Sequence, residues 1–357
     1  MDEAAPVFGV MLLSGDMAVT AFFMVSGFLM ALILETKYFG RVGSFYVNRI
    51  LRIYPPYLVA LAGSVAFFFL LGANPYHEPF TVLAWFLDAE AWPALAWSAL
   101  TNLTLIGINL VRYIDFDQTG QFFVNAFEPG PVRGHNILFV PQAWTLSLEL
   151  YYYALVPLVV LLRTRYIAAI TALLFYLDHD ALRYIASLGL DFSPASSFPF
   201  QLKYFLLGSL GFRFAAPIRA LADRYRAFRL LPPISLVAGF ILVFSGLPAL
   251  RAWNFEMDWF YLAVAVCLPG MFICSNGWKI DAALGEYSYP VYLFHFTVKI
   301  GTYLWAPLEW HGELTVAITL LLAAAYIQLV DKRVEAVRRD IARNGIRRSR
   351  VAAPGVA

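Results

Sequence analysis

The chain has 357 residues, of which 61% are hydrophobic, 17% aromatic and only 14% charged. A soluble globular domain has about 25% charged residues, so this composition excludes that class and indicates an all-α, polytopic integral membrane protein. The formal charge of +2 indicates no particular partner, and no nucleic-acid motif is present. Cys267 and Cys274 share a helix face within one apolar run, which indicates packing rather than a disulfide or a metal site.

The first predicted membrane segment runs from about Asp16 to Leu34. It contains the core FF-x-x-SGF, formed by Phe22, Phe23, Ser26, Gly27 and Phe28. Ser26 and Gly27 are small enough to let another helix backbone approach closely. Helix packing is therefore one interpretation of this core, and substrate contact is the other.

A basic loop follows, which we expect to be cytoplasmic. Within FYVNRILRIYPPYL, Arg49 and Arg52 lie three positions apart and share a helix face. Two guanidiniums in this arrangement suit the phosphates of a nucleotide-like donor. Positive-inside topology alone would also explain the charge.

The next predicted span is about Tyr57–Leu71. Arg163 and Arg165 should be cytoplasmic, like the Arg49 loop, so an even number of crossings separates these basic segments. Tyr57–Leu71 and Gln142–Leu162 already supply two. We therefore interpret Ala94–Val111 as a helix that lies on or dips into the outer face, and we place the Asp115 loop outside.

The most informative stretch is WTLSLELYYYALVP, from Trp144 to Pro157. It places Glu149 inside an apolar run, where an ionised group costs about 2.5–3.5 kcal/mol at the bilayer centre. Such a residue usually faces the protein interior and has a function. One helix face, which can hydrogen-bond a substrate or a neighbouring span, carries Thr145, Glu149, Tyr152 and Tyr153. The alternative is an interfacial carboxylate paired with an arginine.

The later spans alternate with basic and acidic loops, which supports the topology. In total we expect about nine spans, a membrane-embedded domain over residues 1–331 and a basic cytoplasmic tail over residues 332–357. The later spans are predicted at Tyr166–Leu177, Phe198–Phe214, Leu231–Leu247, Trp259–Ser275, Leu284–Ala306 and Leu314–Val330.

A second polar stripe lies in GEYSYPVYLFH and the residues after it. Ser288, Tyr292, His295 and Lys299 follow one another at helical spacing inside an apolar span. A neutral imidazole there can act as an acid, a base or a hydrogen-bonding group that orients a substrate. A core histidine bonded to a tyrosine or a carbonyl is the equally weighted alternative. No spacing typical of a metal site is present.

Four of these motifs, in the same order, resemble those of the acyltransferase 3 family of membrane acyltransferases. The stretch from Trp144 resembles the family motif WSLSVE-x-x-FY-x-x-x-P, and the Arg49 loop resembles R-x-x-R-x-x-P. The resemblance implies roles for ten residues of this chain. Glu149 and His295 would be catalytic, Arg49 and Arg52 would bind the donor, and Phe22, Phe23, Ser26, Trp144, Ser147 and Tyr153 would contact substrate.

The resemblance also implies a reaction. An acyl group, often acetyl, would pass from cytoplasmic acyl-CoA, a co-substrate rather than a bound cofactor, to a hydroxyl of a sugar, glycan or lipid acceptor. The setting would be a lipid bilayer, the bacterial inner (plasma) membrane, with the C-terminus cytoplasmic. Two alternatives stay open: a catalytically inactive homologue that acts as a membrane partner, and a proton-coupled transporter that uses Glu149 and His295.

The family fold has ten spans. Its first span carries an arginine and, ten positions later, a histidine taken to be the catalytic base. Nothing before Asp16 contains either residue. We therefore expect this chain to lack the first span, through a misplaced start codon, a gene fragment or real divergence.

Overall fold

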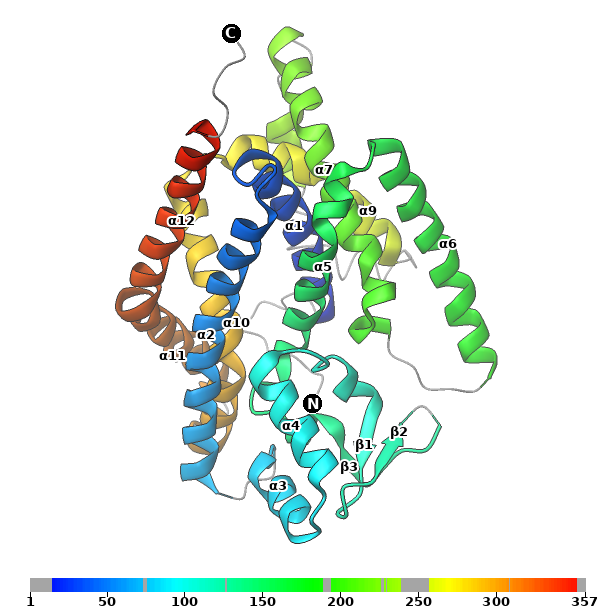
Figure 1. The fold of residues 1–357 in the computed structure, drawn as a ribbon, viewed down its shortest axis with the longest axis vertical. Helices are drawn as coiled ribbons and strands as arrows, with labels where there is room; N and C mark the ends of the chain where they lie inside the picture. Colours follow the sequence, from blue (N-terminus) through cyan, green and yellow to red (C-terminus); the bar gives the residue numbers. More distant parts are fainter. Residues whose placement is uncertain are drawn as a thin grey trace. The chain divides into compact units, whose positions relative to one another are not determined.

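The computed structural model describes residues 15–72, 76–125, 127–188, 194–225, 228, 230–238, 257–307 and 309–351, and their fold is predominantly α-helical (Figure 1). This confirms the predicted fold class. The α-helices are α1 (Gly15–Thr36), α2 (Val42–Leu71), α3 (Pro79–Asp88), α4 (Trp92–Thr104), α5 (Trp144–Leu161), α6 (Thr164–Ser187), α7 (Phe198–Arg224), α9 (Met257–Ser275), α10 (Lys279–Trp305), α11 (His311–Tyr326) and α12 (Lys332–Val351).

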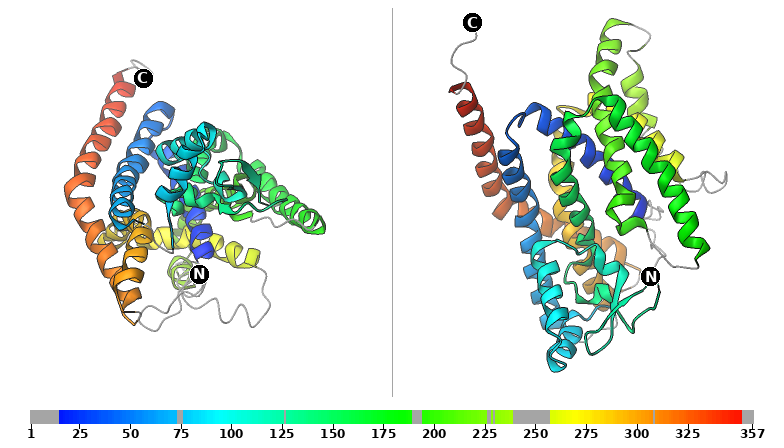
Figure 2. Two further views of the ribbon diagram at one scale, coloured as in Figure 1. Left: turned by 90° about the horizontal axis from the view of Figure 1, so that it is seen from below. Right: turned by 45° about the vertical axis from the view of Figure 1, so that its right-hand side comes forward.

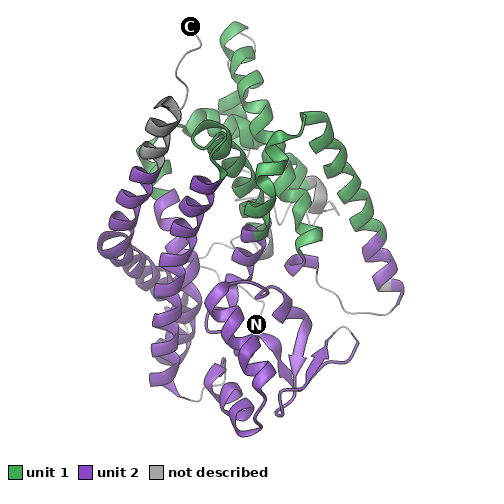
Figure 3. Ribbon diagram, viewed as in Figure 1, with its two compact units in different colours: residues 1–42, 151–180, 198–284 green, residues 43–150, 181–197, 285–357 purple. Residues whose placement is uncertain are grey.

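The chain forms two compact units (Figure 3). Unit 1 comprises Met1–Val42, Tyr151–Asp180 and Phe198–Leu284, and unit 2 comprises Gly43–Leu150, Ala181–Ser197 and Gly285–Ala357. The Glu149 motif begins in unit 2 and continues along α5 into unit 1.

Among the described residues, five helical segments are long and apolar enough to cross a membrane. They are Ala18–Thr36, Val42–Leu71, Pro141–Leu161, Phe198–Arg224 and His311–Ile341. Phe260–Ser275 and Pro79–Asp88 are shorter apolar helices. The predicted count of nine spans stays a prediction, because most of Leu231–Leu247 and all of residues 1–14 lie outside the described residues.

The basic segment around Arg49 differs from the prediction. It is not a loop before a span that begins at Tyr57, but the first half of the continuous helix α2. The helix continues through Pro55 and Pro56, although each proline removes one backbone hydrogen bond. Membrane helices tolerate such prolines more readily than soluble helices do, so this Pro-Pro pair does not mark a helix end.

In unit 1, two glycines allow α1 and α7 to pack backbone against backbone. A Cβ atom built on Gly27 would lie 2.0 Å from the carbonyl oxygen of Phe205, and one on Gly208 would lie 1.9 Å from that of Met24. Around this contact the rings of Phe23 and Phe205 stack with centroids 4.7 Å apart. The predicted packing role of the Ser26–Gly27 pair is therefore confirmed for Gly27.

Polar side chains also tie unit 1 together. The hydroxyl groups of Tyr152 and Ser209 lie 2.5 Å apart, and Ser209 donates to the carbonyl of Gly27 at 3.1 Å. Arg213 pairs with Glu35 at 2.8 Å. These bonds link α5, α7 and α1 inside an otherwise apolar unit.

In unit 2, α2 is the element on which the other helices assemble. The hydroxyl of Tyr57 donates to the carbonyl of Asn102 at the end of α4 (2.5 Å). On α10, Tyr289 donates to the carbonyl of Ile53 (2.9 Å), and Thr297 bonds Ser64 (2.7 Å). The two contacts with α10 lie eleven residues apart on α2, so the two helices run side by side.

A small antiparallel sheet, not predicted from the sequence, lies between α4 and α5. Its order is β2 (Phe122–Val124), β1 (Ile114–Phe116) and β3 (Val132–Arg133), with Asp115 opposite Phe123 and Arg133. Asp115 is buried, pairs with Arg133 at 3.1 Å and accepts the backbone N–H of Gly134 at 3.1 Å. One carboxylate therefore fixes the turn that leads back to α5.

The C-terminal helices form one nearly continuous rod. Helix α11 passes through a π-helical turn, Ile327–Asp331, into α12. The views in Figure 2 agree that α12 runs beside the first half of α2, and Arg338 Nη2 lies 3.5 Å from Asn48 Oδ1. The predicted basic tail is thus helical and partly packed.

Candidate functional site

The first two turns of α5 bury a run of polar side chains. Thr145, Ser147 and Glu149 are buried, together with the indole of Trp144. Burying polar groups costs free energy unless they find partners. The partners of these side chains therefore indicate their role.

The segment before the sheet holds two members of this run. Ser147 donates to Asn109 Oδ1 at 2.9 Å, and Asn109 in turn donates to the carbonyl of Ser196 at 3.0 Å. The guanidinium of Arg112 lies over the ring of Trp144, 5.2 Å from its centroid. Trp144 and Ser147, predicted as substrate contacts, thus have partners within the protein that fix their positions.

Tyr292 connects α10 to the same turns of α5. Its hydroxyl donates to the carbonyl of Gln142 and lies 2.7 Å from Thr145 Oγ1. Since the single hydroxyl hydrogen of Tyr292 goes to the carbonyl, Thr145 is the donor in the second bond. Gln142 also donates to the carbonyl of Leu293 at 2.7 Å. Tyr292 is therefore held rigidly by α5.

Glu149 and His295 both neighbour Tyr292. The Glu149 carboxylate interacts electrostatically with the Tyr292 phenol, and the rings of Tyr292 and His295 have centroids 5.8 Å apart. The two predicted catalytic residues thus lie on opposite sides of the contact between α5 and α10, Glu149 on α5 and His295 on α10. Phe22 and Phe23, predicted as substrate contacts, belong to unit 1, and their role at this site stays a prediction.

The tautomer of His295 follows from its hydrogen bond. Its Nδ1 lies 2.6 Å from the carbonyl oxygen of Tyr292. A carbonyl only accepts, so Nδ1 carries the proton and the neutral ring has its lone pair on Nε2. The Nε2 atom can then accept a proton from another group.

The predicted donor-binding arginines lie near the start of α2. Arg49 is buried, with its Nη2 atom 2.5 Å from Asn48 Oδ1, and Arg52 Nη2 donates to the carbonyl of Gly285 at 3.2 Å. The sequence reasoning missed a third member, Arg338 of α12, which interacts electrostatically with both. The charge pattern of a basic helical tail predicts a solvated surface. The position of Arg338 beside Arg49 and Arg52 therefore becomes visible only when α12 packs on α2.

The remaining predicted contacts lie in unit 1. Phe23, Ser26 and Tyr153 are buried, whereas Phe22 is 39% exposed. Phe23 stacks on Phe205 in the contact between α1 and α7. Within unit 1, Phe23 therefore serves packing, and Phe22 is the more accessible of the predicted aromatic contacts.

Two histidines that the sequence left in loops are also buried. His77 Nε2 lies 2.6 Å from the carbonyl oxygen of Leu138, and burial lowers the pKa of His77 to about 4. His311 bonds Thr302 at 2.9 Å. Within the described ranges no group of three or more His, Cys, Asp or Glu residues could hold a metal ion.

A family model described as an acyltransferase domain, that of acyltransferase 3, matches residues 2–329. No curated protein sequence and no solved structure matches the chain significantly. The expected loss of the first span concerns the chain before Asp16, where residues 1–14 lie outside the described residues.

Proposed function

The chain belongs to the acyltransferase 3 family, and from this premise we propose that it transfers an acyl group from cytoplasmic acyl-CoA to a hydroxyl of a sugar, glycan or lipid acceptor. For the acyl group itself the resemblance implies acetyl. The observation that carries the proposal is that buried Glu149 and His295 both lie near Tyr292, on the two helices that meet there.

In the proposed reaction we assign the role of base to His295, in place of the first-span histidine that the resemblance implies. His295 Nε2 removes the proton of the acceptor hydroxyl as the hydroxyl oxygen attacks the thioester carbonyl carbon. The C–O bond of the new ester forms, the C–S bond breaks, and the proton passes from the imidazolium to the departing CoA thiolate. The Nδ1 bond to the Tyr292 carbonyl keeps one proton on Nδ1, so that Nε2 is free to accept before the transfer and again after it.

Glu149 has a different role in this proposal. A buried carboxylate beside the acceptor site stabilises the positive charge that His295 gains in the transition state, and stabilisation at that point accelerates the chemical step. Arg49 and Arg52 bind the donor phosphates, because guanidiniums match phosphate geometry. We place the protein in the bacterial inner membrane with the C-terminus in the cytoplasm, in line with the basic residues of α12.

The test is transfer of labelled acetyl from acetyl-CoA to membrane glycans and lipids by purified protein in nanodiscs. Glu149→Gln keeps size and hydrogen bonding but removes the charge. We expect it to lower transfer at least about a hundredfold, as other preorganised electrostatic groups do, and to leave expression near normal. Glu128→Gln, at an exposed loop position, is the matched control. Normal transfer by Glu149→Gln would refute the assigned role.

A further inference from the structure

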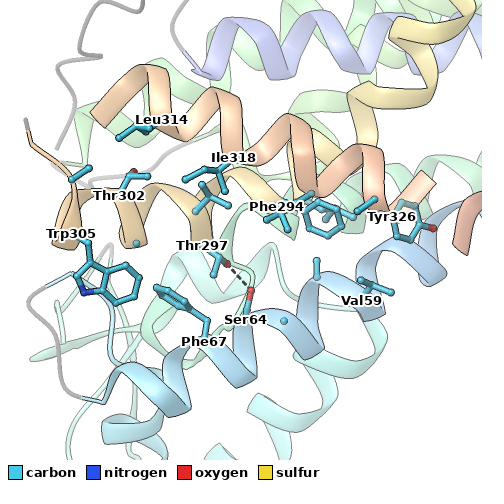
Figure 4. Close-up of a pocket in the computed structure, with 18 of the residues that line it drawn as sticks. Val59, Ser64, Phe67, Phe294, Thr297, Thr302, Trp305, Leu314, Ile318 and Tyr326 are labelled. Atoms are coloured by element: carbon cyan, nitrogen blue, oxygen red, sulfur yellow. Dashed lines mark hydrogen bonds between the residues drawn. The ribbon is translucent and has the colours of Figure 1, made fainter. Parts of the chain in front are cut away.

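Unit 2 contains a large apolar groove between α2, α10 and α11 (Figure 4). Its volume is about 700 Å³, and its lining runs from Val59 and Tyr326 at one end to Phe67 and Trp305 at the other. Two polar side chains in its wall, Ser64 and Thr297, bond each other at 2.7 Å, and a third, Thr302, bonds His311. An apolar cavity stays dry, so the groove suits hydrocarbon.

Charge gathers beyond one end of the groove. Tyr326, at that end, interacts electrostatically with Arg52, Arg338 and Asp331, and Arg338 pairs with Glu335 at 2.6 Å. Arg49, Arg52 and Arg338 thus place three guanidiniums against two carboxylates. Like charges this close repel one another, so an anion with several charges would stabilise the cluster.

Tyr326 lies between the two regions. Its side chain lines the groove and is only 4% exposed, and its hydroxyl oxygen is buried without a hydrogen-bond partner within the described part of the chain.

The spacing between the cations and the groove is similar on three helices. On α2, Arg52 lies seven residues before Val59. On α10, Gly285, whose carbonyl accepts a hydrogen bond from Arg52, lies eight residues before Leu293. On the C-terminal helix, Arg338 of α12 lies eight residues after Val330. At 1.5 Å per residue, each offset is about 10–12 Å along the helix axis. The ligand therefore needs a spacer between its phosphates and its hydrocarbon chain.

We propose that the groove binds the hydrocarbon chain of an acyl-CoA longer than acetyl-CoA, while the cluster of Arg49, Arg52 and Arg338 binds its phosphates. The proposal rests on the proposed function and names the class of donor. In acyl-CoA the flexible pantetheine arm separates the phosphates from the acyl chain and can bridge an offset of about 10–12 Å. A bilayer phospholipid, whose chains begin a few bonds from its phosphate, would leave that gap unfilled.

The proposed position of the donor brings the thioester to the height of His295 on α10. Leu293, Phe294 and Thr297 line the groove, and His295 follows Phe294 directly but does not itself line it. A thioester at the mouth of the groove lies at the level of His295 along this helix, with Tyr326 packed against Phe294 at 6.0 Å between ring centroids. The acyl chain then extends toward Trp305.

The experiment compares binding of CoA, acetyl-CoA, octanoyl-CoA and palmitoyl-CoA to the purified full chain in detergent. Ala325→Phe fills the groove from α11, and Ala317→Phe, an exposed position on the same helix that does not line it, is the matched control. We expect palmitoyl-CoA to bind about tenfold or more tightly than acetyl-CoA, since each buried methylene adds favourable transfer free energy. Ala325→Phe should reduce this ratio at least about fivefold and leave acetyl-CoA binding unchanged.

Arg338→Gln should weaken all four ligands by a similar factor, because the phosphates are common to them. Equal affinity across chain lengths, or no effect of Ala325→Phe, would overturn the groove assignment alone. Failure of every acyl-CoA to bind would overturn the proposed function as well. A palmitoyl lysophospholipid that binds more tightly than palmitoyl-CoA and is sensitive to Ala325→Phe would show that bilayer lipid occupies the groove, and the inference would be wrong.

Discussion

Replacing Gly27 by alanine is expected to separate α1 from α7. The added Cβ would lie 2.0 Å from the carbonyl oxygen of Phe205, whereas such contacts are essentially never shorter than 3.0 Å. The difference, 3.0 − 2.0 Å, requires a shift of at least about 1 Å between two backbones. Backbone atoms cannot rotate away as a side chain can, so the helices themselves must move.

The cost follows from this shift. Overpacking a well-packed contact costs about 1–3 kcal/mol, and a 1 Å separation also weakens the stacking of Phe23 on Phe205. Because alanine has a higher helix propensity than glycine, the substitution also stabilises the helix by up to about 1 kcal/mol. We therefore expect Gly27→Ala to lower the free energy of unfolding by about 2 kcal/mol.

The assay is denaturant unfolding in mild detergent, with Gly63→Ala as the matched control. Gly63 is also within a helix, but a Cβ there meets nothing within 4 Å, so the control should be neutral or slightly stabilising. Gly208→Ala should cost as much as Gly27→Ala. The double variant should cost less than the sum, because one separation relieves both clashes. Wild-type stability in both single variants would refute the close packing of α1 on α7.

Three further predictions concern the site, the topology and pH. His295→Ala should lower acyl transfer sharply if Nε2 is the base, and only severalfold if it orients the acceptor; rates for His295→Ala and His295→Asn distinguish these roles, and unchanged rates would exclude both. With the native cysteines removed, Gln118→Cys should react with an impermeant thiol reagent on intact cells and Ala336→Cys only after permeabilisation; the reverse pattern would invert the topology. Burial lowers the pKa of His77 to about 4, below the value of about 6.5 in the unfolded chain. The contribution of neutral His77 to the free energy of unfolding is therefore fully present above pH 6.5, and it falls by up to about 3 kcal/mol as the pH drops to 4. His77→Gln should flatten this dependence of stability on pH, and an unchanged dependence would assign it to other groups.

The sequence predicts those features that depend on local pattern. Helix α1 and the small-residue contact at Gly27 follow from apolar length and composition. The buried position of Glu149 follows from the high cost of an ionised group at an exposed position in the bilayer. Each of these inferences concerns one helix and the solvent around it, so no knowledge of partner helices is needed.

The missed features depend on which helices meet. Arg338 lies in a segment whose charge pattern favours solvent, and it reaches Asn48 only because α12 packs on α2. The sheet around Asp115 has strands of two or three residues, too short for an alternating pattern to be recognised. The Pro55–Pro56 pair suggested the end of a basic loop, but in a membrane helix it does not interrupt α2.

The π-helical turn at Ile327–Asp331 holds one residue more than the α-helical turn it replaces. Loss of a single residue there would restore a regular helix and leave the face of α12 that meets α2 nearly unchanged, because the wider turn already absorbs the extra residue. Loss of a residue elsewhere between 332 and 337 has no such turn to absorb it, and one residue corresponds to about 100° of rotation. Such a deletion would turn Arg338 away from Asn48 although no contact residue had changed.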